Sequence, residues 1–178
     1  MQWKSSERRY GAVAMAIHWA SAAAILGLLA SGFIADNETD PAAKAAILRV
    51  HAAVGILILL LTLARIAWWA FADARPALPG GMAGWQMRVS RLVHNLFYVV
   101  ILGMAASGVA MLALSGAAAI LYFGAPGPLP DFETLPPRAA HGLGAWAMLA
   151  LLALHLGAAL FHQLVMRDRL LARMMPSA

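Results

Sequence analysis

The sequence predicts an all-α integral membrane protein, a bundle of four transmembrane helices. Of its 178 residues, 62% are hydrophobic and only 12% are charged, with a mean hydropathy of +0.74. The hydrophobic residues form four long runs, each at or above the roughly 20 residues that a helix needs to cross a bilayer. The basic residues flank these runs, as topology signals do. The net charge of +5 therefore does not indicate binding to nucleic acid.

The predicted spans follow one another within a single membrane domain, residues 1–178. They are Ala12–Ile34, Ala45–Phe71, Leu92–Leu114 and Ala139–Met166. The first span is too long for the apolar core of a signal peptide, and no clean A-x-A cleavage site accompanies it. It also contains His18, which a removable segment would not need.

Three further segments connect the second, third and fourth spans. Ala74–Gly84 is rich in proline and glycine and is expected to be a loop. Ala117–Phe123 is apolar but too short to span, so we expect it to lie at the interface or to cap the bundle. Gly124–Pro137 contains several prolines and glycines and should interrupt helical structure before the fourth span.

The distribution of charge predicts that both termini are cytoplasmic. The N-terminus, the loop after the second span and the C-terminus share one face of the membrane, and basic residues outnumber acidic residues in each. On the opposite face acidic residues are in excess. That face carries Asp36, Glu38, Asp40, Asp131 and Glu133 against Lys44, Arg49 and Arg138. By the positive-inside rule, the basic face lies in the cytoplasm.

All six histidines fall within or at the ends of the predicted spans. They are His18, His51, His94, His141, His155 and His162. Ionisable residues inside membrane helices are costly and usually functional, and six across four helices are hard to explain as packing. The chain has no cysteine, which excludes covalent haem attachment and thiolate metal sites. Any haem must therefore be held non-covalently, by histidine or methionine.

The depths of two histidines in the fourth span predict two stacked cofactors. This span enters from the outer face, so His141 lies near that face. His155 follows 14 residues later, which is about 21 Å deeper and close to four full turns. The two side chains therefore share one helix face and lie near opposite sides of a hydrocarbon core about 30 Å thick. This spacing suits two haems, one in each half of the bilayer.

Each of these histidines needs a partner at the same depth on another helix. His51 lies early in the second span, which also enters from outside, so it is expected to pair with His141. His18 and His94 both lie one to two turns into spans that enter from the cytoplasm. Either could face His155, and depth alone leaves both partners open.

Other residues lie where a haem would need them. Gly55 and Gly144 share helix faces with His51 and His141, where they could let a porphyrin approach the backbone, although glycine is frequent in membrane helices anyway. Arg65 follows His51 by 14 residues and should reach the inner haem. It could pair with a haem propionate, or its side chain could extend to the cytoplasmic interface.

Three cations cluster at the outer ends of the spans, near the outer pair of histidines. They are Lys44, Arg49 and Arg138. They could neutralise haem propionates, a role that we assign to Arg49 in particular, or they could be ordinary interface anchors.

Four segments of the sequence carry a family resemblance. They read YGAVAMAIHW, HAAVGILILLLTLARIAWW, RLVHNLFYVV and HLGAALFHQLVMRDRLLARMMP. Together they resemble the prokaryotic cytochrome b-561 family over nearly the whole chain. The resemblance implies a four-helix bundle of the bacterial inner membrane with two haem b groups. It also implies that His18 and His155 hold the cytoplasmic haem, and that His51 and His141 hold the periplasmic one.

The resemblance further implies an activity. Superoxide in the periplasm would be oxidised to oxygen, and the electrons would pass through both haems to ubiquinone, which makes the chain a superoxide:ubiquinone oxidoreductase. His94 and His162 would lie at the ubiquinone site near the cytoplasmic side. Lys44, Arg49 and Arg138 would then steer the superoxide anion to the outer haem.

Two alternatives remain open. The chain could be a b-type electron-transfer subunit that links a periplasmic dehydrogenase or a soluble cytochrome to the quinone pool, because one fold serves many functions. Alternatively, the histidines could line a path for protons or transition metals without any haem. That second alternative explains the paired depths poorly.

Overall fold

The computed structural model describes residues 2–77 and 83–175. In this part of the chain it contains five α-helices and no strand. The helices are α1 (Ala12–Asn37), α2 (Pro41–Ala67), α3 (Gly84–Ser115), α4 (Ala117–Phe123) and α5 (Pro136–Phe161). One π-helical turn, Trp68–Ala72, extends α2 and another, His162–Met166, extends α5, and short 3₁₀ turns lie at Phe132–Thr134 and Leu171–Met174.

The all-α class and the four spans are confirmed. Within the described residues, four helices are long and apolar enough to cross a membrane, namely Ala12–Asn37, Pro41–Ala72, Gly84–Ser115 and Pro136–Met166. Each extends past the predicted apolar run, because a helix satisfies its own backbone hydrogen bonds beyond the hydrocarbon region. The predicted loop Ala74–Gly84 is non-helical over residues 74–77 and ends where α3 begins at Gly84, and its residues 78–82 lie outside the described residues.

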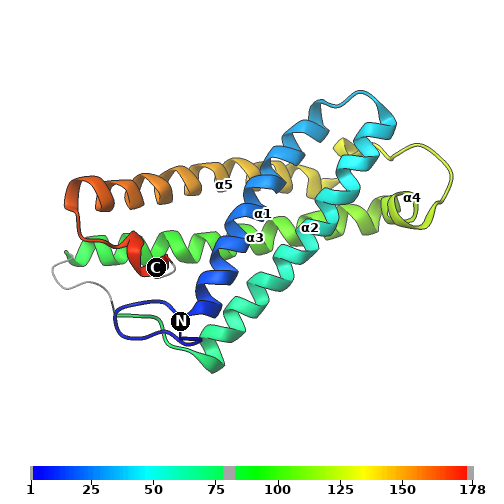
Figure 1. The fold of residues 1–178 in the computed structure, drawn as a ribbon. Helices are drawn as coiled ribbons and strands as arrows, with labels where there is room; N and C mark the ends of the chain where they lie inside the picture. The colour runs from blue at the N-terminus through cyan, green and yellow to red at the C-terminus, as the bar shows by residue number, and fades with distance from the viewer. Residues whose placement is uncertain (1, 78–82, 176–178) are drawn as a thin grey trace.

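The four long helices form two pairs that cross one another (Figure 1). Helix α1 packs along α2, α3 packs along α5, and α2 and α3 join the two pairs. The buried centre is Ile25 and Leu29 from α1, Ile58 from α2 and Met148 from α5. On the outside, apolar side chains such as Leu57, Leu60 and Leu63 of α2 are about half exposed. Lipid tails are as apolar as these side chains, so exposing them in the bilayer carries no hydrophobic cost.

The bundle has two ends, which we call the outer end and the inner end. The outer end comprises residues 38–40 and 116–135, and the inner end comprises residues 2–11, 68–77 and 167–175. At the outer end, the tight connection between α1 and α2 is stabilised by Asp40. Its carboxylate accepts hydrogen bonds from the backbone N–H groups of Ala42 (2.7 Å) and Ala43 (3.1 Å), and Pro41 starts the helix.

Helix α4 closes the outer end, as predicted for a cap. Gly116 adopts a left-handed conformation (φ 70°), which turns the chain between α3 and α4. Ala117 and Leu121 are buried against the bundle. Arg49 Nε donates a hydrogen bond to the Leu121 carbonyl (2.6 Å), and the Tyr122 hydroxyl donates one to the Arg49 carbonyl (2.6 Å). Two hydrogen bonds therefore connect helices α2 and α4.

At the inner end, the side chains of Asp73 and Arg173 each make several hydrogen bonds that join the N-terminal segment to the rest of the chain. The Asp73 carboxylate accepts hydrogen bonds from the Ser5 backbone N–H (3.0 Å), the Ser5 hydroxyl (2.8 Å) and Trp68 Nε1 (3.2 Å). The Arg173 guanidinium donates to the carbonyls of Arg8 (2.7 Å) and Ala77 (2.7 Å). Residues 2–11 consequently lie close to residues 171–175, as Figure 1 shows.

Replacing Asp73 by Asn is expected to lower the free energy of local opening of residues 2–11 by about 1 kcal/mol. The value is low because the carboxylate is largely accessible to water. Burial raises the pKa of Asp73, but hydrogen bonds from Ser5, Trp68 and Ala74 outweigh it, so this pKa lies below the ordinary value. The contribution to stability is therefore complete above about pH 4 and is lost as the pH falls through the lowered pKa. Hydrogen exchange of residues 2–11, corrected for the intrinsic rate, measures this loss.

The matched control is Asp131→Asn, which removes a carboxylate from the outer end. It should leave exchange in residues 2–11 unchanged. Equal protection of this segment in the wild type and in Asp73→Asn would show that Asp73 does not hold it.

Candidate haem-binding site

Two of the predicted histidines face each other in the outer half of the bundle. The rings of His51 on α2 and His141 on α5 have centroids 6.2 Å apart and planes inclined by 63°. These are the residues for which equal depth predicts a pair. The structure brings them together across the crossing of the two helix pairs.

Each ring of this outer pair is supported by a serine from the neighbouring helix. The Nδ1 atom of His51 lies 2.9 Å from Ser31 Oγ on α1, and that of His141 lies 3.0 Å from Ser107 Oγ on α3. A neutral imidazole that donates a hydrogen bond through Nδ1 carries no proton on Nε2, which leaves the Nε2 lone pair for a metal. Sequence reasoning missed both serines.

Glycines make room for the same two rings. A Cβ atom added at Gly32 would lie 3.3 Å from His51 Cε1, and one at Gly108 would lie 3.5 Å from His141 Cε1. Of the two glycines predicted to face a cofactor, Gly55 has open space beside it among the described residues. A Cβ at Gly144 would instead meet Met104 Cγ at 2.6 Å, so this glycine allows α3 and α5 to pack closely. The structure therefore assigns Gly144 to helix packing.

In the inner half, His155 on α5 contacts both of its predicted partners. Its ring centroid lies 6.3 Å from that of His18 on α1, with planes inclined by 64°. It lies only 5.4 Å from that of His94 on α3, edge to face at 88°. The Nδ1 atom of His94 is also 2.6 Å from the Ser90 carbonyl oxygen.

Ring separation tests whether these pairs fit a haem iron. Metal–imidazole nitrogen bonds are about 2.0–2.1 Å long and the ring centroid lies roughly 1.1 Å beyond the nitrogen, so imidazoles on opposite sides of one iron have centroids roughly 6.3 Å apart. The His51–His141 and His18–His155 separations of 6.2 and 6.3 Å fit this value. The His94–His155 separation of 5.4 Å is too short.

The histidines do not form a metal-ion site by themselves. Over residues 2–77 and 83–175, the structure has no group of three or more histidine, aspartate or glutamate side chains that could hold a metal ion. A porphyrin supplies four of the six ligands of its iron, so a pair of imidazoles is the donor set that a haem requires.

Arg65 lies beside the inner pair, at the depth predicted from its spacing to His51. Its Nη1 atom is 3.5 Å from His18 Nδ1, at the outer limit of a hydrogen bond. Its Nε atom is buried and has no hydrogen-bond partner among the described residues. Buried donors are nearly always paired in proteins, so this orphaned donor fits an acceptor supplied by a bound group, such as a propionate.

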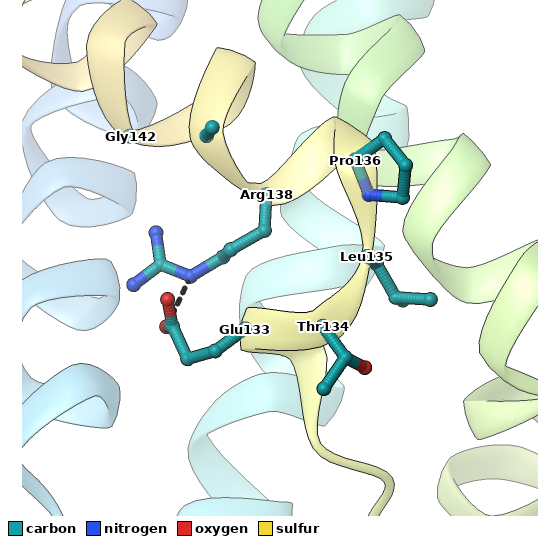
Figure 2. A pocket seen from close by; sticks show the side chains of 7 residues that line it. Glu133, Thr134, Leu135, Pro136, Arg138 and Gly142 are labelled. Carbon is teal, nitrogen blue, oxygen red and sulfur yellow. Dashed lines mark hydrogen bonds and ion pairs between the residues drawn. The ribbon is translucent and has the colours of Figure 1, made fainter.

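The outer cations differ from one another in what they contact. Arg138 pairs with Asp36 on α1 (2.5 Å) and with Glu133 (2.7 Å). Arg49 is held by α4, and Lys44 is half-buried. Figure 2 shows Arg138 and Glu133 at an open pocket where α5 begins. The pocket is lined by Glu133, Thr134, Leu135, Pro136, Arg138, Ala139 and Gly142.

The two remaining histidines, His94 and His162, have different contacts. His94 is exposed on α3 and contacts His155, whereas His162 is buried and its Nδ1 atom lies 2.5 Å from Asp168 Oδ2. Positive φ angles at Arg167 (53°) and Arg169 (57°) turn the chain so that Asp168 reaches back to His162. Sequence reasoning missed Asp168; its only signal was an acidic residue among arginines just after the last span.

Histidine rings that face each other in pairs across a four-helix membrane bundle define the class of b-type membrane cytochromes. Comparison of the sequence agrees, since the family described as prokaryotic cytochrome b561 matches residues 9–177. The chain belongs to this family. Its members bind haem b, and the chain is accordingly a multi-pass bacterial membrane protein of electron transfer.

Two relatives from Escherichia coli (strain K12) are similar to the chain. Cytochrome b561 homolog 1 is 32% identical over 131 residues, which covers 71% of this chain and 73% of the relative. Cytochrome b561 homolog 2 is 25% identical over 185 residues, which covers 98% of this chain and 95% of the relative.

Proposed function

We propose that the chain holds two haem b groups in the bacterial inner membrane and transfers electrons from periplasmic superoxide to ubiquinone. The outer haem would be held by His51 and His141, and the inner haem by His18 and His155. The observation that carries this proposal is the separation of both ring pairs, 6.2 and 6.3 Å, since each fits two imidazoles on one iron. The basic inner end would face the cytoplasm.

A haem with two histidine ligands supplies one-electron transfer and has no open position for binding oxygen. Each superoxide anion would give up one electron and leave as oxygen. Two electrons and two protons convert one ubiquinone to ubiquinol, so two superoxide anions are consumed for each quinone. The chain must therefore provide a donor surface at the outer end, and a quinone site with a proton supply at the inner end.

His94 has the surroundings of a quinone contact. It lies against His155 and is exposed on α3, where its neighbours Leu92 and Leu96 are 56% and 38% exposed. A quinone dissolved in the bilayer could reach this position without crossing the bundle. Because the Nδ1 proton of His94 is donated to the Ser90 carbonyl, its Nε2 atom would accept a hydrogen bond from the hydroxyl of the reduced quinone beside the inner ring pair.

His162 and Asp168 supply a route for protons at the same end of the bundle. The short contact between Asp168 Oδ2 and His162 Nδ1 orients the imidazole. Because Asp168 lies after the last helix, it links the buried imidazole to water. This arrangement supports His162 as the residue that passes protons toward the quinone.

The outer end also supports a second candidate function. Superoxide is an anion, but the charge of Arg138 is offset by Asp36 and Glu133, and Glu38 and Asp40 add further negative charge nearby. Such a surface would attract a positively charged protein donor better than an anion. The second candidate is therefore a b-type subunit that accepts electrons from a periplasmic dehydrogenase or a soluble cytochrome.

Spectroscopy of the purified protein tests both proposals. We expect a reduced-minus-oxidised spectrum of b-type haem at two haems per chain, reduction by superoxide, and formation of ubiquinol. If Lys44, Arg49 and Arg138 steer superoxide, the rate should fall as ionic strength rises. Absence of a b-type band would rule out the haem assignment. Haems that are reduced by dithionite but not by superoxide would favour the second candidate.

A further inference from the structure

The outer and inner ring pairs differ in what supports them. His51 and His141 are both hydrogen-bonded through Nδ1 to a serine hydroxyl, at 2.9 and 3.0 Å. His18 has only Arg65 at 3.5 Å, and no serine in the described part of the chain holds His155. The two serines lie in the same local sequence, Ala-Ser-Gly, at residues 30–32 and 106–108.

Neighbouring carbonyl groups indicate the direction of these hydrogen bonds. Ser31 Oγ donates its proton to the Leu28 carbonyl (3.2 Å), and Ser107 Oγ donates to the Met104 carbonyl (2.9 Å). A hydroxyl has a single proton to donate. A serine that donates to the carbonyl accepts from the histidine. For His141 a second contact agrees, because its Nδ1 atom also lies 3.1 Å from the Met104 carbonyl oxygen, which can only accept. We assign the Nδ1 proton to both rings on this basis.

The glycine after each serine holds the same ring from the side. Gly32 and Gly108 leave space for the Cε1 edges of His51 and His141, which approach to 3.3 and 3.5 Å of the position that a Cβ atom would occupy. Each Ser-Gly pair thus orients one ring by a hydrogen bond and by close packing. The same device is used twice, by α1 for His51 and by α3 for His141.

A hydrogen bond accepted from the Nδ1 proton makes the imidazole a stronger electron donor to the metal and stabilises the oxidised iron. The positive charge of Arg65 beside the inner pair acts in the opposite sense and favours the reduced iron. We propose that Ser31 and Ser107 are positioning residues that orient His51 and His141 and lower the midpoint potential of the outer haem below that of the inner haem. This inference rests on the proposed function, and it makes electron flow from the outer end to the inner end favourable.

Redox titration of the purified haem-loaded protein tests the inference. Ser31→Ala and Ser107→Ala should each raise one of the two midpoint potentials. We expect a change on the order of tenfold in the reduction equilibrium, or about 59 mV for a one-electron couple. The other potential should stay unchanged. Arg65→Gln should lower that other potential, which identifies it as the inner one.

Two matched variants separate a role of the hydroxyl from a general loss of structure. Ser31→Thr and Ser107→Thr keep the hydroxyl and should keep the wild-type potential and both haems, even where the alanine variant loses haem. Ser21→Ala removes another buried serine of α1, ten residues before Ser31, and should leave the outer potential unchanged.

Unchanged potentials in the alanine variants would overturn the inference. So would threonine variants that behave like the alanine variants, or a shift of the same potential by serine and Arg65 variants. Failure of the proposed function can be distinguished from failure of this inference. In that case the wild-type protein itself would lack b-type absorption or would not be reduced by superoxide.

Discussion

The His51→Ala variant is expected to bind one haem per chain instead of two and to lose ubiquinone reduction by superoxide. Alanine leaves His141 as a single imidazole, so the outer haem would lose one of the two bonds that hold its iron. The inner pair remains intact. Electrons would then have to cross the roughly 21 Å between the depths of His141 and His155 in one step, so we expect the rate to fall by at least about 100-fold.

Haem content per chain and the rate of ubiquinol formation measure this effect. The matched control is Val50→Ala, the preceding residue on α2, whose side chain is 62% exposed. It should keep two haems and the full rate. Two haems retained in His51→Ala would show that His51 is not an axial ligand.

The double variant His94→Phe/His162→Phe is expected to keep both haems and to lose quinone reduction. Phenylalanine fills the volume of each imidazole but cannot donate a hydrogen bond or a proton. Superoxide should still reduce the protein in a single turnover, since the outer end is untouched. Ubiquinol formation in multiple turnovers should fall by about 100-fold or more, because general acid catalysis contributes on this scale.

The single variant Asp168→Asn tests the proton route within this site. It should leave both haem signals in place and slow ubiquinol formation less than the double variant does, because His162 remains. Loss of one haem from the double variant would instead make His94 the ligand of the inner iron. An unchanged rate of ubiquinol formation would place the quinone elsewhere.

The fold could be predicted from the sequence because four apolar runs with basic flanks have few alternatives in a membrane. The cap formed by Ala117–Phe123 and the helix break before α5 followed from length and from proline and glycine content. Depth along a helix was also predictable, since the rise per residue is constant. The proximity of His51 to His141 and of Arg65 to the inner pair followed from that rise alone.

Contacts between helices at one depth were not predictable in the same way. Depth left His155 with two possible partners. The packing of the helices sets the distance from the His155 ring centroid to each of them, 6.3 Å for His18 and 5.4 Å for His94. Ser31 and Ser107 lie on other helices than the histidines that they support, so no spacing along the chain reveals them. The contact between Asp168 and His162 depends on two residues with positive φ, which arginines rarely adopt.

Helix α5 contributes one histidine to each of the two ring pairs, His141 to the outer and His155 to the inner. It also follows α1, α2 and α3 along the chain. A nascent chain that has inserted α1, α2 and α3 therefore has half of each pair and no complete site. On the proposed assignment, neither haem could gain both of its histidine ligands before α5 is inserted.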